Sequence, residues 1–203
     1  MKVALINGSP KPGSSVSGVN LQAMRERLGD EHEYVVGSAI SLDVAQLEGC
    51  QAILFAFPLY VDGIPSRLLR LLCEMVADIS RIAPDVMVWA IVNNGFFEGH
   101  QNALALDMVK SFCACAGVGW GQGIGVGAGG MAMAAPIGSG PMKSLGLALD
   151  SLADNMLQAR AAADRFVTPN FPRALYRLGG TFGWRRQAKQ NGLKAKDILA
   201  KRV

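Results

Sequence analysis

Short apolar runs alternate with helical patterns along most of this chain, and the alternation limits the fold more than any other feature. The apolar runs cover residues 2–7, 32–39, 52–58, 86–94 and 119–130. Patterns of helical period cover residues 16–29, 64–80, 100–117 and 142–166. The run at 52–58 is apolar throughout, as expected of a strand buried on both faces. The sequence therefore predicts a parallel sheet of five strands with helices on both faces.

The composition is that of a folded domain. Half of the 203 residues are hydrophobic and 18% are charged, so intrinsic disorder is not indicated. The first residues lead directly into the strand at 2–7, without the pattern of a signal peptide. The weakly charged stretch 111–142 is broken by many glycines and by Pro136 and Pro141, so it is not a continuous membrane-spanning helix. We therefore expect a cytoplasmic protein with no membrane partner.

Charge divides the chain into two segments. Residues 1–167 hold 11 basic and 15 acidic residues, a net charge of −4, whereas residues 168–203 hold nine basic residues and one Asp, a net charge of +8. We therefore predict a folded domain at 1–167 and a basic, aromatic-containing extension at 168–203.

The extension contains too many apolar residues for a disordered arm, and glycines at 179–180 and 192 are expected to divide it into short helical pieces. Four roles are open: packing on the acidic body, crossing to a partner subunit, binding the 2′-phosphate of NADPH through Arg185 and Arg186, or contacting nucleic acid or a membrane. Docking on the body or on a partner subunit is favoured. No nucleic-acid partner is expected, because no recognition motif accompanies the charge.

Cysteine and histidine patterns indicate no metal or hydrolase chemistry. The four cysteines, which form no CxxC motif, are interpreted as small buried hydrophobic residues: Cys50, Cys73, Cys113 and Cys115. No group of Cys, His, Asp or Glu has the spacing of metal ligands. The chain has two histidines and no nucleophile elbow. The sequence thus predicts no metal site and no protein residue acting as a catalytic acid or base.

Three loops are the candidate ligand sites, because ligands of parallel sheets bind at the carboxyl ends of strands near the topological switch point. These loops follow the first, third and fourth apolar runs and read GSPKPGSSVSG (8–18), PLYVDGIP (58–65) and NNGFFEGH (93–100). We call them loop 1, loop 2 and loop 3.

Loop 1 has the chemistry of a phosphate cradle. It lacks both the GxGxxG and the GxxxxGK[ST] patterns, but it leads from a strand into a helix start and is rich in hydroxyl groups. The groups in question are Ser9, Lys11, Ser14, Ser15 and Ser17. A helix N-cap would account for one of these serines, Ser15 or Ser17, but not for all four and the lysine. Loop 1 is therefore predicted to bind an anion such as a phosphate monoester.

The three loops resemble those of flavodoxin-like NAD(P)H-dependent FMN reductases. GSPKPGSSVS is similar to the G-S-P-R-x-x-S-x-T phosphate loop of that family, AFPLYVDGIPSRLLRLLCE to its second loop, and NNGFFEGHQNALALDMVKSFCACAG to its third loop and helix. The resemblance covers about residues 1–165. Lys11 stands where arginine is usual, Ser17 stands where threonine is usual, and Pro12 stiffens the loop. Lysine keeps the charge but loses the bidentate fork, which implies lower phosphate affinity.

The resemblance implies a flavodoxin-like three-layer sandwich with strand order 2-1-3-4-5, followed by the C-terminal extension. It implies that the FMN phosphate is bound by Ser9, Pro10, Lys11, Ser15, Val16 and Ser17. It implies that the isoalloxazine ring lies along Pro58, Leu59, Tyr60, Val61 and Asp62. It implies that the pyrimidine end of the flavin meets Asn93, Asn94, Gly95 and Phe96, with a tight turn at Asn94-Gly95.

The implied function is that of an FMN-dependent oxidoreductase. Hydride from NADPH or NADH would reduce the flavin, and electrons would then pass to a small acceptor (a quinone, flavin, azo or nitro compound) in a ping-pong cycle. The family also implies a homodimer. Two alternatives stay open: an electron carrier of the flavodoxin type, although carriers are usually acidic and this chain has a pI near 9.0, and a non-catalytic flavin-binding module.

Two further features have open roles. His100 either faces the substrate or lies in solvent at a helix start. The charge-free, glycine-rich stretch 121–142 either lies near a subunit interface or the nicotinamide, or forms a buried fifth strand and its loop.

Overall fold

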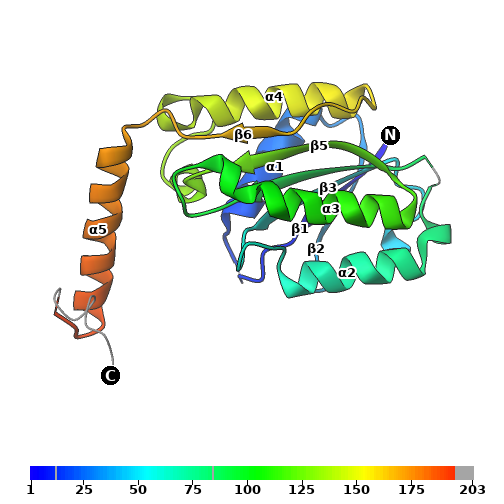
Figure 1. The fold of residues 1–203 in the computed structure, drawn as a ribbon. Helices are drawn as coiled ribbons and strands as arrows, with labels where there is room; N and C mark the ends of the chain where they lie inside the picture. The colour runs from blue at the N-terminus through cyan, green and yellow to red at the C-terminus, as the bar shows by residue number, and fades with distance from the viewer. Residues whose placement is uncertain (12, 84, 195–203) are drawn as a thin grey trace. The chain divides into compact units, whose positions relative to one another are not determined.

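Six parallel strands form one sheet in the order β2-β1-β3-β4-β5-β6 (Figure 1). The computed structural model describes residues 1–11, 13–83 and 85–194 of the chain. The strands are β1 (Lys2–Asn7), β2 (Glu33–Ser38), β3 (Ala52–Pro58), β4 (Met87–Asn93), β5 (Gly119–Val126) and β6 (Arg165–Val167). The predicted order of the first five strands is confirmed, and the predicted number of five is wrong because β6 adds to the outer edge of β5.

Five α-helices accompany the strands: α1 (Val16–Leu28), α2 (Ser66–Ala77), α3 (Ala103–Ala116), α4 (Lys143–Leu157) and α5 (Arg173–Gln190). Helix α1 begins where predicted, because the side chain of Ser15 accepts a hydrogen bond from the backbone N–H of Gly18 at 3.1 Å. Gly29 follows α1 and Gly117 follows α3, both at positive φ. These glycines confirm the predicted helix ends.

Two hydrophobic cores lie on opposite faces of the sheet. Helices α1 and α4 cover one face, and α2 and α3 cover the other (Figure 1). Along β3, Phe55 belongs to the core with α2 and α3, whereas its neighbour Leu54 belongs to the core with α1 and α4. The central strands are therefore buried on both faces, as their apolar sequences predict.

The sixth strand replaces the end of a predicted helix. The helix predicted for 142–166 ends at Leu157, and Ala159 at φ 47° follows it. Residues 165–167 then pair in parallel with Ile124–Val126. The fifth strand, predicted for 119–130, ends at Val126.

Asp164 fixes the entry into β6. Its carboxylate accepts hydrogen bonds from the backbone N–H of Gly123 at 2.8 Å and from the indole of Trp120 at 3.3 Å. It also pairs with the ammonium group of Lys110 at 2.6 Å. These partners lie at least 41 residues away in the sequence, so no local pattern indicates the strand.

Removing the Asp164 carboxylate is expected to destabilise the fold. Asp164→Ala removes the acceptor of the Gly123 N–H and the shorter of the two ion pairs of Lys110, and we expect it to lower the free energy of unfolding by about 2–3 kcal/mol. Asp107→Ala is the matched control, because Asp107 also pairs with Lys110 but its side chain is 64% exposed, against 9% for Asp164. Its cost is expected to stay below about 1 kcal/mol. Urea unfolding of both variants measures the difference, and equal costs would contradict this account.

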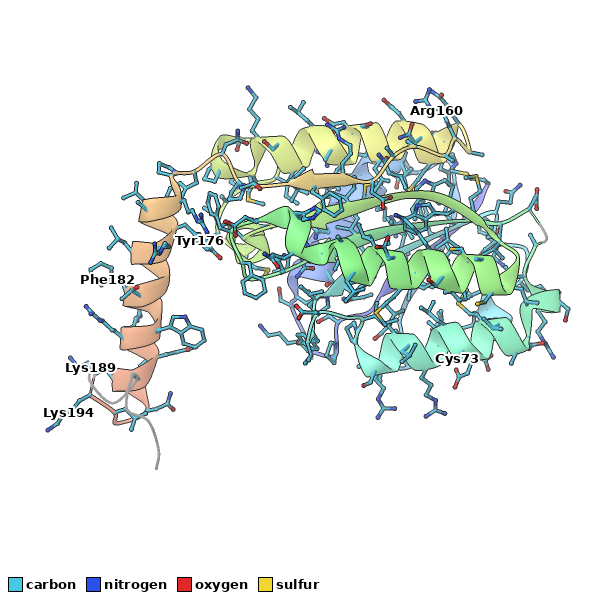
Figure 2. All side chains as sticks on the ribbon, in the orientation of Figure 1. Cys73, Arg160, Tyr176, Phe182, Lys189 and Lys194 are labelled. Carbon is cyan, nitrogen blue, oxygen red and sulfur yellow. The ribbon has the colours of Figure 1, made fainter. Side chains whose placement is uncertain are left out.

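The four cysteines divide into two pairs. Cys50 and Cys113 are buried as predicted, but Cys73 and Cys115 are exposed, so the interpretation as buried residues is wrong for these two. Cys73 lies on α2 and is labelled in Figure 2. Burial raises the pKa of the Cys113 thiol to about 12 and also raises the pKa of Cys50.

Thiol reactivity is expected to follow this division. At about pH 8 a disulfide reagent should label Cys73 and Cys115 rapidly, and Cys50 and Cys113 only on unfolding, because the thiolate is the nucleophile. The raised pKa of Cys113 means that the folded state disfavours its thiolate. The contribution of Cys113 to the stability of the fold is therefore fully present below the ordinary thiol pKa of 9.0, and it declines as the pH rises from there toward about 12. Counting fast and slow thiols by absorbance tests the assignment. Four fast thiols would contradict it.

The chain divides into two compact units, Met1–Pro169 and Asn170–Val203, and residues 195–203 of the second lie outside the described residues. The predicted boundary lies two residues earlier, at 167/168. In the second unit, α5 runs without a break through Gly179 and Gly180, so the prediction of separate short pieces is wrong for residues 173–190. Within the described part of the chain, no helix is long and apolar enough to cross a membrane.

Candidate functional site

The three predicted loops meet at one pocket of about 140 Å³, at the carboxyl ends of β1, β3 and β4. Eight of the fifteen predicted site residues line it: Ser9, Lys11, Ser15, Val16, Ser17, Pro58, Tyr60 and Asn93. Two further lining residues, Ser14 and Met133, are not among the fifteen. The remaining seven predicted residues do not line the pocket: Pro10, Leu59, Val61, Asp62, Asn94, Gly95 and Phe96.

Loop 1 is held in shape by Asn7, the last residue of β1. The side-chain oxygen of Asn7 accepts a hydrogen bond from the backbone N–H of Ser9 at 2.9 Å, and its amide nitrogen donates to Ser15 Oγ at 3.2 Å. The hydroxyl of Ser9 in turn accepts from the N–H of Lys11 at 3.3 Å. Gly8 is required between them, since a Cβ there would lie 2.8 Å from the Cβ of Phe57.

The electrostatics of the pocket favour an anion. Lys11 is an exposed cation at its edge, and no carboxylate is among the lining residues. Among the residues that the structure describes, no acidic group lies within ion-pair distance of Lys11. The pocket also adjoins the start of α1, whose first turn contains no acidic residue, so the positive end of the helix dipole is not neutralised there. Hydroxyl donors, a lysine and a helix start together suit a phosphate group.

Asn93 connects the three loops. Its side-chain oxygen accepts a buried hydrogen bond from the hydroxyl of Ser17 at 3.1 Å, and its backbone oxygen accepts from the N–H of Leu59 at 2.8 Å. Residues far apart in the sequence are thereby fixed relative to one another.

Loop 2 contains a strained two-residue turn. Tyr60 and Gly63 exchange two backbone hydrogen bonds of 3.0 Å, and the residues between them, Val61 and Asp62, lie at φ 48° and 57°. Turns of this kind usually contain Asn-Gly, and a β-branched residue in this region is unusual. Such a conformation costs on the order of 1–3 kcal/mol and is typical of ligand sites. Val61 is fully exposed at the tip, next to the half-exposed Tyr60.

Loop 3 is anchored by Asn94 rather than opened toward the pocket. The backbone N–H of Asn94 donates to Val126 at 3.0 Å, and its side-chain nitrogen donates to the backbone oxygen of Glu98 at 3.2 Å. Gly95 does not adopt a positive φ, so the predicted tight turn at Asn94-Gly95 is not of the left-handed type. Phe96 is exposed.

The glycine-rich stretch packs against loop 3 and β6 of the same chain. The N–H of Gly129 donates to Asn94 at 2.8 Å, and the N–H of Gly127 donates to Val167 at 2.9 Å. A Cβ on Gly99 would lie 2.6 Å from the carbonyl oxygen of Gly125 and 2.8 Å from the nitrogen of Val167. The structure thus favours the buried-strand interpretation of 121–126.

His100 does not line the pocket. It is exposed at the start of the turn preceding α3, and its ring packs edge-on against Phe166 with 4.9 Å between ring centroids. For metals, the described residues contain no group of three or more His, Cys, Asp or Glu side chains that could hold an ion.

Sequence comparisons find no match: no protein-family model and no curated protein matches the chain. Solved structures do match in fold. An NADH:FMN oxidoreductase in its apo form matches with a TM-score of 0.60 and 13% identity, covering 79% of this chain and 90% of its own. A flavodoxin of Streptococcus pneumonia TIGR4 matches with a TM-score of 0.59 and 11% identity, and the match covers 78% of this chain and 99% of the flavodoxin. An azoreductase of Bacillus anthracis str. Sterne matches with a TM-score of 0.52 and 12% identity, and the match covers 75% of this chain and 96% of the azoreductase. The fold is therefore flavodoxin-like, with β6 added to the predicted five strands.

Proposed function

We propose that this protein binds FMN and acts as an NAD(P)H-dependent flavin reductase of the family that its loops resemble. The observation that carries the proposal is the pocket in which the serine hydroxyls and Lys11 of loop 1 meet loops 2 and 3 with no carboxylate present. It lies at the switch point between β1 and β3, where sheets of this type bind FMN.

The size of the pocket fits the phosphate end of FMN. Its volume of about 140 Å³ is several times that of a water molecule but too small for a complete flavin nucleotide. The side chains of Ser9, Ser15 and Lys11 would hold the phosphate, whereas the hydroxyl of Ser17 donates its one proton to Asn93. The residues predicted to meet the ring, from Pro58 to Asp62 and from Asn93 to Phe96, belong to the two loops that border this pocket.

The protein residues would bind and orient, and the redox chemistry would come from the cofactor. Bound FMN would accept hydride from NADPH or NADH and pass electrons to a small acceptor such as a quinone, flavin, azo or nitro compound. Tyr60 offers a flat, half-exposed aromatic surface beside the pocket. The backbone of Val61 and Asp62 is held in one conformation by the closed turn, which presents its polar groups at a fixed place. The cytoplasmic location remains a prediction.

The alternative of an electron carrier has one observation in its favour, because a flavodoxin is among the structures of similar fold. A carrier and a reductase differ in their electron donor. The reductase takes hydride directly from NAD(P)H, whereas the carrier needs a protein donor.

Visible absorption spectra of the purified protein test these proposals. Spectra recorded after adding FMN, and then NADPH or NADH, should show oxidised flavin bands that disappear with the nucleotide and return in air. Bands that form with FMN but persist with both nucleotides would favour the carrier. Absence of bound flavin in excess FMN would contradict the cofactor assignment and leave the fold without its usual chemistry.

A further inference from the structure

Helix α5 lacks the features of a helix that is stable alone. Its 18 residues include three internal glycines, Gly179, Gly180 and Gly183. Each glycine costs about 0.8–1 kcal/mol relative to alanine in a helix interior. It contains five basic residues and no acidic residue, so no ion pairs within the helix offset this cost. Since most helical stability in proteins comes from packing of an apolar face, α5 needs a surface to pack on.

One side of α5 combines apolar and basic residues. Leu175, Leu178 and Phe182 are 50%, 55% and 67% exposed, and Arg185 and Lys189 continue the same stripe at spacings of three and four residues. Figure 2 shows Phe182 and Lys189 extending from the same side of the helix. This apolar-basic stripe has the residue spacing of a helix face that packs on another helix.

Helix α4 carries an exposed stripe of matching chemistry. Leu147 and Leu157 are 57% and 43% exposed, and Asp150 and Asp154 lie between them on the same face, again at spacings of three and four residues. Leucines on the buried face of a helix are expected, but leucines alternating with carboxylates on its outer face are not.

The carboxylates of this stripe are available. Among the described residues, no cation lies within ion-pair distance of Asp154. Asp150 pairs with Arg27 at 2.7 Å, yet its side chain remains 57% exposed. The stripe of α4 therefore offers apolar surface beside two exposed carboxylates, of which Asp150 already pairs with Arg27.

We propose that α5 of one copy docks on the outer face of α4 of a second copy, in a reciprocal two-fold dimer. Arg185 and Lys189 would face Asp150 and Asp154, and Phe182 would cover the α4 leucine that adjoins them, since both lie three residues from the charged pair. Each dimer would contain this contact twice, as two-fold symmetry requires. The proposal does not depend on FMN binding.

The link before α5 favours a second copy over the same chain. A helix that packed along α4 of its own chain would have to reverse direction after β6 within residues 168–172. Pro169 and Pro172 lie in this segment, and a proline disfavours helical turn conformations in the residue before it, which are Thr168 and Phe171 here. Short, stiff connections of this kind favour exchange between copies.

A lipid surface is the competing partner for a basic helix. Membrane-surface helices present one apolar face and one polar face. In α5 the exposed Trp184 follows Leu175 by nine residues, which places it half a turn away from the apolar-basic stripe. Apolar groups on opposite sides fit protein packing better than a flat membrane interface.

Light scattering on the full-length protein tests the proposal through charge reversal. The wild type should have the mass of two copies. Asp154→Lys in α4, and Arg185→Glu with Lys189→Glu in α5, should each raise the dimer dissociation constant about tenfold or more. Glu48→Lys, an equal charge change at an exposed residue outside α4, should leave it unchanged. An equimolar mixture of the α4 variant and the α5 variant should recover the dimer mass. In the mixed dimer, one contact joins a wild-type α4 to a wild-type α5. The other contact joins the variant α4 to the variant α5, whose substituted residues again carry opposite charges.

Three outcomes would overturn the proposal. The first is a wild-type protein that has the mass of a single copy at all concentrations. This result would overturn the proposal even if the α5 variant had a lower melting temperature than the wild type. The second is a dimer that none of these variants weakens. The third is a single copy that sediments with vesicles of anionic phospholipid and loses this property on Arg185→Glu with Lys189→Glu, which would assign α5 to a membrane.

Discussion

Replacing Lys11 by glutamate is expected to weaken FMN binding about 100-fold, because one charge-assisted hydrogen bond contributes roughly 1.5–3 kcal/mol and the new carboxylate repels the phosphate. Lys11 is exposed and has no acidic partner among the described residues, so Lys11→Glu should leave the free energy of unfolding unchanged. Quenching of flavin fluorescence measures the dissociation constant of FMN in both proteins.

Riboflavin, which lacks the phosphate, is the matched control ligand. Its affinity should be the same in the wild type and in Lys11→Glu, since the substitution acts on the phosphate alone. Lys11→Arg supplies a bidentate donor and should bind FMN more tightly than the wild type. Equal losses for FMN and riboflavin in Lys11→Glu would show that the phosphate does not bind at loop 1.

The sequence predicts the parts of this fold that depend on local periodicity. The strand at 52–58 is recognisable because a strand buried on both faces is apolar throughout, and α1 because Ser15 and Gly29 bracket an apolar pattern. Strand β6 is not recognisable, because three residues carry no period and their placement depends on the distant partners of Asp164.

The candidate site is predictable to a similar extent. Loop 1 is marked by its serines and lysine, and the strand order brings loops 2 and 3 beside it. Met133 lines the same pocket but lies in a charge-free, glycine-rich stretch where no local signal distinguishes it from Met131. The left-handed turn at Val61 and Asp62 is also hidden, since neither residue type favours that conformation. Its stability must come from the surrounding structure rather than from the turn sequence.

Glycines, which have no Cβ, allow close packing at the junction of loop 3, β5 and β6. Gly99 and Gly127 approach neighbouring backbone atoms so closely that a methyl group would not fit, and those carbonyl and amide groups have no rotamer to change. A methyl group on Gly125 would meet the ring of Phe166 and the carbonyl oxygen of Gly99. Loop 3 is thereby pressed against the ends of both strands. Its position beside the pocket thus depends on the sixth strand as well as on its own residues.

Gly99→Ala is therefore expected to destabilise the protein by about 3 kcal/mol, at the upper end of the range for overpacking. For a chain of this length that corresponds to a fall in melting temperature of roughly 6–12 °C. The new Cβ would meet the carbonyl oxygens of Val167 and Gly125, so loop 3 or β6 must move. FMN binding should weaken with it, because Asn93 and Asn94 at the start of loop 3 are tied to the other two loops and to β5.

Gly95→Ala in the same loop is the matched control. A Cβ on Gly95 meets no atom within 4 Å and its φ is not positive, so the melting temperature should stay within about 2 °C of the wild type. Thermal unfolding of both variants, with and without FMN, separates crowding at the junction from a general intolerance of loop 3. If Gly99→Ala were as stable as Gly95→Ala, the contact between loop 3 and β6 could not position the site. Loop 3 would then have to be held by Asn94 and Asn93 alone.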